Sequence, residues 1–322
     1  MARGYMGKML FVDLSQNKLR DETLDEKLCR EFIGGYGIGA RILFSGQKAG
    51  VDPLGPDNTL GILTGPFTGT PAVSGTRFTV VAKSPLTGGW GDANSGGYFG
   101  AFLKYAGYDA LFFTGISAKP VYLFINNGKA ELRDAAHIWG KDTYETEEIL
   151  KSELGKDAEV ACIGPAGENR SLISAIINKS RTAARSGLGA VMGSKRLKAV
   201  AVNGKMKVPL ADEEKTRELR KKWQAELGGH IVWLKPFGTP FLVDIGVQSG
   251  DSPVKNWTGA GVIDFPDFQN LAKEAVNERT DNKFACNMCP IGCGGYMNAG
   301  TGENKYGDGA RRTEYETTAM FG

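Results

Sequence analysis

Three cysteines lie close together near the C-terminal end of the sequence, in the segment Cys286-Asn-Met-Cys289-Pro-Ile-Gly-Cys293. Spacings of two and then three residues allow the three thiols to converge on one soft metal centre, and thiolates select zinc or iron–sulfur clusters. The glycines on either side of Cys293 let the backbone wrap closely and direct amides at sulfur atoms, which tunes the potential of a cluster. This segment is the strongest indication of metal chemistry in the sequence.

Three interpretations of the cysteine segment stay open on spacing alone. A [4Fe-4S] cluster takes four cysteines as a rule, so a fourth ligand would come from elsewhere. A structural zinc site needs four nitrogen or sulfur ligands, and the two histidines, His137 and His230, are distant in the sequence. The third interpretation is three reduced thiols without a metal. The order of the spacings is the reverse of that in radical-SAM loops, which argues against that class.

Three further segments combine glycine or serine with a basic or amide side chain, at residues 74–88, 92–100 and 181–195. Backbone amides of a loop, together with arginine, are a common way to hold phosphate. None of the segments matches a Walker P-loop or a dinucleotide-binding fingerprint, and a tight turn between strands also explains each one alone. Because the 45 glycines of the chain fall in several such clusters, the sequence predicts a large ligand held by the backbone.

The residues before about position 205 alternate between short apolar runs and turns, which is typical of β-strands. The expected strands are residues 9–12, 59–63, 78–82, 110–114, 121–125, 160–163 and 199–202. Helical apolar spacing occurs at residues 25–33, 97–106, 144–154 and 268–278. We therefore expect a two-layer sheet domain with some helices rather than strict alternation of strands and helices.

The character of the sequence changes near residue 207. Pro209 and Asp212 open a charged, amphipathic stretch that runs to about residue 227, with Asp212 as the expected helix N-cap. We therefore predict an α+β fold in two parts. A β-rich, two-sheet cofactor-binding domain is expected at residues 1–207, and the start of a mainly α-helical domain at residues 208–322.

Composition and charge argue against several classes of partner. The 322 residues include 39 Lys and Arg against 36 Asp and Glu, a net charge of +3, and the two signs are mixed along the chain. This balance gives no reason to expect nucleic acid or a membrane surface as a partner. No stretch reaches the roughly 18 apolar residues of a membrane span. The N-terminal residues predict a strand rather than a signal peptide, so the expected location is the cytoplasm.

The two other cysteines, Cys29 and Cys162, stand alone in apolar surroundings. Free cysteine is among the most buried residue types, so we expect both to be buried thiols. The five cysteines do not form the paired pattern of a secreted, disulfide-bonded framework.

At these residues the sequence resembles the aldehyde:ferredoxin oxidoreductase family, which uses a tungsten (or molybdenum) bis-pterin cofactor. The resemblance extends over essentially the whole chain and keeps the order of the family's motifs. The matching motifs lie at residues 7–15, 63–70, 82–88, 93–100, 104–109, 137–141, 163–169, 189–195, 253–256 and 286–294. The resemblance implies oxidation of aldehydes to carboxylic acids. Electrons would pass through a [4Fe-4S] cluster to ferredoxin or a ferredoxin-like electron-transfer subunit.

The resemblance also implies cofactor contacts for individual residues. Contacts with the pterin phosphates, and with a magnesium ion between them, are implied for Arg77, Asn94, Ser95 and Gly96. A second phosphate loop is implied for Arg181, Thr182 and Ala184. This loop has the sequence Arg-Thr-Ala-Ala-Arg-Ser-Gly, where the family usually has Arg-Ala-Ala-Gly-Arg-Gly-Gly. Alanine at position 184 would be unsuitable only if that position needs a positive φ.

The same resemblance assigns the metal chemistry. Cys286, Cys289 and Cys293 match three of the four cluster ligands, and Glu316 matches a glutamate near the metal. A carboxylate there can accept a proton during oxidation of an aldehyde hydrate. The family's fourth cluster cysteine, its catalytic histidine and a second set of pterin contacts lie beyond residue 322. We therefore expect a fragment of a longer protein, or a chain completed by another in a homodimer or hetero-oligomer.

Two alternative functions stay open. Within the same cofactor class, a low-potential reductase of an aromatic thioester or carboxylate would use the same cofactor contacts. From a different class, an electron-transfer or binding fragment that carries zinc or an iron–sulfur cluster, without a pterin, needs only the three cysteines. That second alternative does not explain the three glycine-rich segments.

Overall fold

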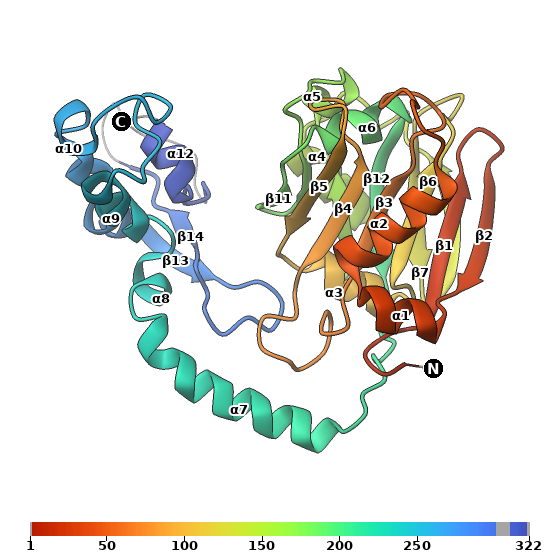
Figure 1. Cartoon of the computed structure of the whole chain (residues 1–322), viewed down its shortest axis with the longest axis horizontal. Helices are drawn as coiled ribbons and strands as arrows, with labels where there is room; N and C mark the ends of the chain where they lie inside the picture. Colours follow the sequence, from red (N-terminus) through yellow and green to blue (C-terminus); the bar gives the residue numbers. More distant parts are fainter. Residues whose placement is uncertain (1, 301–309, 321–322) are drawn as a thin grey trace. The chain divides into compact units, whose positions relative to one another are not determined.

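The computed structural model describes residues 2–300 and 310–320. The chain divides into two compact units, residues 1–217 and residues 218–322 (Figure 1). The expected domain boundary between residues 207 and 208 lies shortly before this division and stays a prediction. Within the described residues, no helix is long and apolar enough to span a membrane.

The first unit contains a mixed six-stranded sheet with the strand order β2-β1-β6-β3-β4-β5. Its strands are β1 (Lys8–Asp13), β2 (Lys18–Thr23), β3 (Leu60–Thr64), β4 (Phe78–Lys83), β5 (Trp90–Ser95) and β6 (Ala110–Thr114). Only β1 and β6 run parallel, and the other neighbours are antiparallel. Strand β5 therefore forms one edge of the sheet, and it carries part of the second glycine-rich segment.

A second six-stranded sheet in the same unit has the order β11-β10-β9-β12-β7-β8. Its strands are β7 (Val121–Asn126), β8 (Lys129–Asp134), β9 (Glu159–Cys162), β10 (Ile176–Asn178), β11 (Arg181–Ala183) and β12 (Leu197–Asn203). Strands β12 and β7 are parallel. The short hairpin β10–β11 lies at one edge and carries the start of the third glycine-rich segment, where Thr182 is exposed.

The main core of the first unit is formed by the facing sides of the two sheets together with two short helices. These helices are α3 (Phe99–Tyr105) and α6 (Leu188–Ser194). The other face of the first sheet is covered by α1 (Glu26–Phe32) and α2 (Gly35–Gly46), and that of the second sheet by α4 (Thr143–Leu154) (Figure 1). Helix α5 (Pro165–Glu168) packs against α6.

A glycine on α2 explains its close approach to the first sheet. A Cβ atom at Gly39 would lie 2.9 Å from Cγ2 of Val81 on β4, so a side chain there would force helix and sheet apart. Asp142 caps α4 with a complete capping box that includes Glu145, which is a strong local start signal.

The second unit is mainly helical and has a small apolar core. Its elements are most of α7 (Glu213–His230), then α8 (Leu234–Phe237), α9 (Phe241–Ser249), α10 (Gly261–Asp264), the 3-10 helix η1 (Phe268–Leu271), α11 (Lys273–Glu278), β13 (Thr280–Phe284), β14 (Gly294–Met297) and α12 (Tyr315–Met320). The backbone amide of Lys215 donates to Oδ1 of Asp212 at 2.8 Å, which confirms the expected N-cap of α7. The predicted α+β fold, with a β-rich part before a mainly helical part, is confirmed.

Candidate cofactor and metal sites

Two of the predicted phosphate contacts, Arg77 and Asn94, meet at the edge of the first sheet. The pairing of β4 with β5 places Phe78 opposite Ser95, so Arg77 lies beside the end of β5. Nη1 of Arg77 donates a hydrogen bond to Oδ1 of Asn94, and Nδ2 of Asn94 donates to the hydroxyl of Tyr36 in the first turn of α2. Both predicted residues have exposed side chains. The chain therefore presents a guanidinium and an amide together at an accessible edge.

The turn after Ser95 is held against the β10–β11 hairpin by Asn178. Oδ1 of Asn178 accepts hydrogen bonds from the backbone amides of Tyr98 and Phe99, each at 3.1 Å. Gly97 has a φ of +90°, and a Cβ atom there would lie 2.6 Å from Oδ1 of Asn178 and 3.6 Å from Cβ of Arg181. The segment with Ser95, which is buried, and Gly96 therefore lies directly beside the start of the second phosphate loop.

Asn178 is itself fixed on its other side. Its Nδ2 donates to Oε2 of Glu159 at 3.1 Å and to the carbonyl oxygen of Val160 at 2.9 Å, and its side chain is fully buried. Lys179 forms an ion pair with Glu159 at 2.7 Å and lies over the ring of Tyr98 at 3.9 Å. The hairpin that carries Arg181 is thus connected by side chains to both sheets. Sequence reasoning missed Asn178, because its partners are distant in sequence.

Two serines join the remaining glycine-rich segments. The hydroxyl of Ser84 donates to the carbonyl oxygen of Ser186 at 2.9 Å, and the hydroxyl of Ser186 donates to the carbonyl oxygen of Asp92 at 3.1 Å. Ser186 stands at a φ of +63°, a left-handed conformation that favours glycine. The three segments singled out in the sequence therefore converge in the folded unit.

The second phosphate loop departs from the resembled family at Thr182, Ala184 and Ser186, and of these only Ser186 stands at a positive φ. Thr182 and Ala184 are both exposed, and Ala184 is not among the residues at positive φ. The condition under which alanine would be unsuitable at position 184 is therefore not met. Arg181 and Thr182 lie in β11, which pairs with β10.

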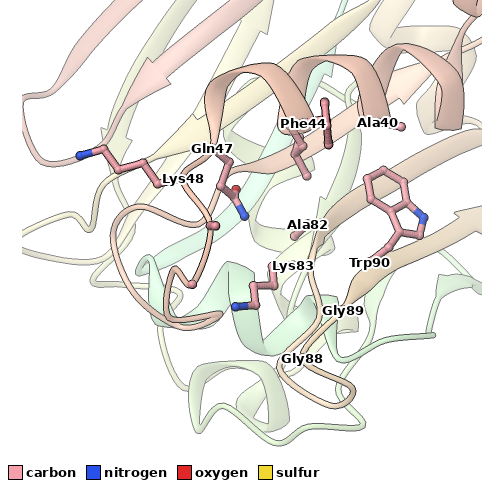
Figure 2. A pocket seen from close by; sticks show the side chains of 12 residues that line it. Ala40, Phe44, Gln47, Lys48, Ala82, Lys83, Gly88, Gly89 and Trp90 are labelled. Carbon is pink, nitrogen blue, oxygen red and sulfur yellow. The ribbon is translucent and has the colours of Figure 1, made fainter.

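A cavity of about 610 Å³ lies at the other end of β5 (Figure 2). Phe44 of α2, Lys83 of β4 and Trp90 of β5 line it, and Figure 2 shows these side chains around its opening. Nε1 of Trp90 donates to Oδ2 of Asp92 at 3.0 Å. Because side chains alternate along a strand, Trp90, Asp92 and Asn94 share one face of β5. An aromatic and polar surface thus runs from the cavity to the Arg77–Asn94 pair.

The three cysteines of the metal segment lie on the connection between β13 and β14. The amide of Cys289 donates to the carbonyl oxygen of Cys286 at 3.0 Å, and all three thiol residues are half-buried. Three soft thiols with adjacent glycines fit the donor chemistry of an iron–sulfur or zinc centre. Across the described residues, however, no three His, Cys, Asp or Glu side chains are already gathered around one point.

The two isolated cysteines are buried in the first unit, as expected. Burial raises the pKa of the Cys29 thiol to about 11 and that of Cys162 to about 12. Both groups therefore stay protonated at neutral pH, whereas a metal ligand must be a thiolate.

The predicted proton acceptor, Glu316, is exposed in the first turn of α12. The neighbouring Glu314 is partly buried and accepts a hydrogen bond from the hydroxyl of Thr239, which in turn accepts one from the amide of Tyr315 at 3.1 Å. Sequence reasoning did not single out Glu314. The role of Glu316 stays a prediction.

Two family models match this chain. Residues 9–204 match the model described as aldehyde ferredoxin oxidoreductase, N-terminal domain, and residues 215–322 match that described as aldehyde ferredoxin oxidoreductase, domains 2 and 3. Together the matches cover both units.

Similar proteins include the tungsten-containing aldehyde ferredoxin oxidoreductase of Pyrococcus furiosus, which is 45% identical over 296 residues, 90% of this chain and 49% of that protein. The aliphatic sulfonate oxidoreductase, WOR-like subunit, of Pyrococcus furiosus is 36% identical over 310 residues, 90% of this chain and 49% of that protein. A solved active-site complex (BamBC) of benzoyl coenzyme A reductase with 1,5-dienoyl-CoA is also similar. Its TM-score is 0.78 at 31% identity, over 92% of this chain and 48% of that chain. The chain thus spans about half the length of the relatives it matches.

Proposed function

The chain belongs to the aldehyde ferredoxin oxidoreductase family, and on that premise we propose that it is part of a tungsten-pterin enzyme that oxidises aldehydes to carboxylic acids. The observation that carries the proposal is the convergence of the three glycine-rich segments, through Arg77 and Asn94, Asn178, and Ser186. A zinc or electron-transfer protein without a pterin has no need for this arrangement. We place the reaction in the cytoplasm.

The first unit would hold the pterin phosphates. Arg77 and Arg181 supply guanidinium groups, which suit phosphate oxygens through parallel hydrogen bonds. Asn94 supplies an amide, and the backbone around Gly96 can approach a ligand closely. Asn94 and the loop that contains Thr182 and Ala184 would hold a magnesium ion between the phosphates. When bound, the pterin-held tungsten supplies the two-electron redox chemistry, while the protein supplies position and electrostatics.

The second unit would hold a [4Fe-4S] cluster through Cys286, Cys289 and Cys293, with a fourth ligand from outside the present sequence. The three thiols come from one loop, so their positions are set together by the hairpin β13–β14. Ferredoxin, or a ferredoxin-like subunit, is the proposed electron acceptor.

Glu316 is proposed to accept the proton that leaves the aldehyde hydrate. Its carboxylate is exposed, so a substrate could reach it. The variant Glu316→Gln should lower kcat and remove the acidic limb of the pH profile. Glu314→Gln is the matched control, since Glu314 is engaged with Thr239. An unchanged pH profile in Glu316→Gln would remove this residue from the mechanism.

The comparisons favour the aldehyde substrate over the reductive alternative. The aldehyde oxidoreductase of Pyrococcus furiosus is 45% identical to this chain, against 31% for the benzoyl coenzyme A reductase complex. The alternative without a pterin is not favoured either, because the matched models include the domain that carries the glycine-rich segments.

Anaerobic purification of the full-length protein, with elemental analysis and an aldehyde-dependent dye reduction assay, tests the proposal. We expect tungsten and iron in the wild-type protein and loss of tungsten in Arg77→Met. The control Arg20→Met removes an exposed arginine from β2, at the opposite edge of the sheet, and should retain tungsten. Wild-type protein that folds fully but contains no tungsten would contradict the proposal.

A further inference from the structure

A buried arginine lies against the cysteine loop of the second unit. Arg312 is only 6% exposed as a residue, and its Nη2 donates a hydrogen bond to the carbonyl oxygen of Cys293 at 2.6 Å. Its backbone amide also donates to the carbonyl oxygen of Gly295 at 2.9 Å. Arg312 therefore holds the last of the three cysteines where the loop enters β14.

Two glycines make room for this guanidinium. A Cβ atom at Gly238, which has a φ of +65°, would lie 2.1 Å from Nη2 of Arg312 and 2.5 Å from the carbonyl oxygen of Cys293. A Cβ atom at Gly295 would lie 3.1 Å from Nε of Arg312. A side chain at Gly238 would displace the guanidinium from Cys293, so the backbone just after α8 and in β14 leaves room for the arginine.

The preceding residue fixes the same hairpin by a different contact. Arg311 pairs with Tyr296 in an isolated bridge, and its guanidinium carbon lies 3.9 Å from the centre of the Tyr296 ring and 4.7 Å from that of Phe284. Phe284 is the last residue of β13 and pairs with Gly294 of β14. The two ends of the cysteine loop are thus held by consecutive arginines, which limits how far Arg312 can move from Cys293.

A fixed positive charge has a definite effect on a metal–thiolate centre. Each electron added to a cluster makes it more negative, and a nearby buried cation stabilises the more negative state because the local dielectric is low. We propose that Arg312 is a positioning residue that holds Cys293 and raises the reduction potential of the cluster bound there. The proposal rests on the proposed function, since it requires an iron–sulfur cluster on these cysteines.

The test is an EPR-monitored redox titration of the anaerobic full-length enzyme. Arg312→Met should shift the ratio of oxidised to reduced cluster about tenfold at a fixed potential, which is a decrease of about 59 mV for one electron. Arg312→Lys keeps the charge and should shift this ratio much less. Arg220→Met is the control. Arg220 also contacts the cysteine loop, since it donates a hydrogen bond to the carbonyl oxygen of Met288 at 2.9 Å, but it is not buried. Solvent screens such a charge, so its removal should leave the potential unchanged.

The outcomes separate this inference from the proposed function. An unchanged potential in Arg312→Met, at the iron content of the wild-type enzyme, would overturn the inference alone. If Arg312→Met fails to hold iron, the neutral variant Arg312→Gln is compared with the charged variant Arg312→Lys. Equal reduction potentials in those two variants would also overturn the inference. Wild-type enzyme without iron would overturn the proposed function and this inference with it.

Discussion

The two candidate sites of this chain differ in how far folding alone completes them. In the first unit, side chains from distant segments are already bonded to one another, as with Arg77 and Asn94 or with Ser186 and Asp92. In the second unit, the thiols share one loop, but no three metal-binding side chains are gathered within the described residues. The comparison indicates that the candidate phosphate site is built by the fold, whereas the candidate metal site would need its metal to be completed.

The largest expected effect follows from removing the metal from the second unit. Metal–thiolate binding can contribute on the order of 10 kcal/mol to the folding of a site, so backbone amides in the cysteine loop should exchange at least about a hundredfold faster without it. The variant Cys289→Ser in the full-length enzyme should show this by hydrogen exchange measured with mass spectrometry. Exchange in β3 and β4 of the first unit should not change.

The matched control is Cys162→Ser, which changes a cysteine buried in the first unit. It should alter exchange around β9 and leave the cysteine loop as in the wild-type protein. Equal protection of the loop with and without iron would mean that the second site is as fully built by folding as the first.

A smaller but still large loss of stability is expected from Asn178→Ala. The side chain makes four hydrogen bonds, to Tyr98, Phe99, Glu159 and Val160. Removal leaves buried amides without an acceptor, at a cost of about 1–3 kcal/mol each, so the first unit should lose about 3 kcal/mol or more. Urea denaturation measures this loss.

Asn126→Ala is the control for that experiment, because Asn126 is an exposed asparagine at the end of β7. It should change the stability by less than about 0.5 kcal/mol. If both variants unfold at the same urea concentration, the phosphate site of the first unit does not depend on its internal hydrogen bonds.

The elements that could be predicted are those with strong local signals. Strands such as β3 and β7 are continuous apolar runs, and α4 begins with a capping box, so their positions follow from nearby residues. Helix α2 was not predicted, because its sequence GYGIGARILFSG contains four glycines, which normally disfavour a helix. Its glycines serve contacts with β4 that are not evident from local sequence.

In the candidate site, too, features that depend on contacts between distant segments could not be predicted from the sequence. Residues 92–95 were identified as part of a ligand segment, but Asp92 and Asn94 are poor strand formers, and β5 exists because it pairs with β4. Arg77, Asn94 and Arg181 could be selected from their types and from the family resemblance. The partners that connect them, Tyr36 and Asn178, could not, since only the folded chain brings them together.

The pH dependence of stability tests how large a free-energy cost the first unit bears for burying a charged lysine. Lys195, at the end of α6, is fully buried and donates to the carbonyl oxygens of Gly115 at 3.2 Å and Pro56 at 3.4 Å. Burial lowers its pKa from 10.5 to about 8, against an opposing effect of Asp57. Between these values the unfolded chain binds more protons, so stability rises with pH, while below about pH 8 the full cost of burying the charge is present.

Lys195→Met removes that cost. The variant should be about 1–3 kcal/mol more stable than the wild-type protein at pH 7, because a buried charge is replaced by an apolar side chain. This advantage should shrink by roughly 1 kcal/mol at pH 9, one pH unit above the lowered pKa. Urea denaturation at the two pH values measures the difference.

The difference in free energy of unfolding between the variant and the wild-type protein cancels the contributions of other titrating groups. Lys104, whose burial lowers its pKa to about 8, also makes stability rise with pH, whereas the raised pKa values of Cys29 and Cys162 make it fall above their ordinary value of 9. Lys156→Met, at an exposed position, is the control and should show no dependence on pH. An advantage of Lys195→Met that is equal at pH 7 and pH 9 would show that the buried lysine is still charged at pH 9, so that burial does not lower its pKa as far as 8.

The smallest effect concerns Ser186, where two opposing contributions can be separated. Ser186→Ala removes the hydrogen bond to Asp92 but keeps a side chain at positive φ, so it should cost about 1 kcal/mol. Ser186→Gly removes the same bond but also relieves a left-handed strain of roughly 1 kcal/mol, so its stability should stay near that of the wild-type protein. Urea denaturation of the two variants side by side measures the difference. If alanine and glycine prove equally stable, the turn does not carry the strain that its φ indicates, and the loss in both variants measures the hydrogen bond to Asp92.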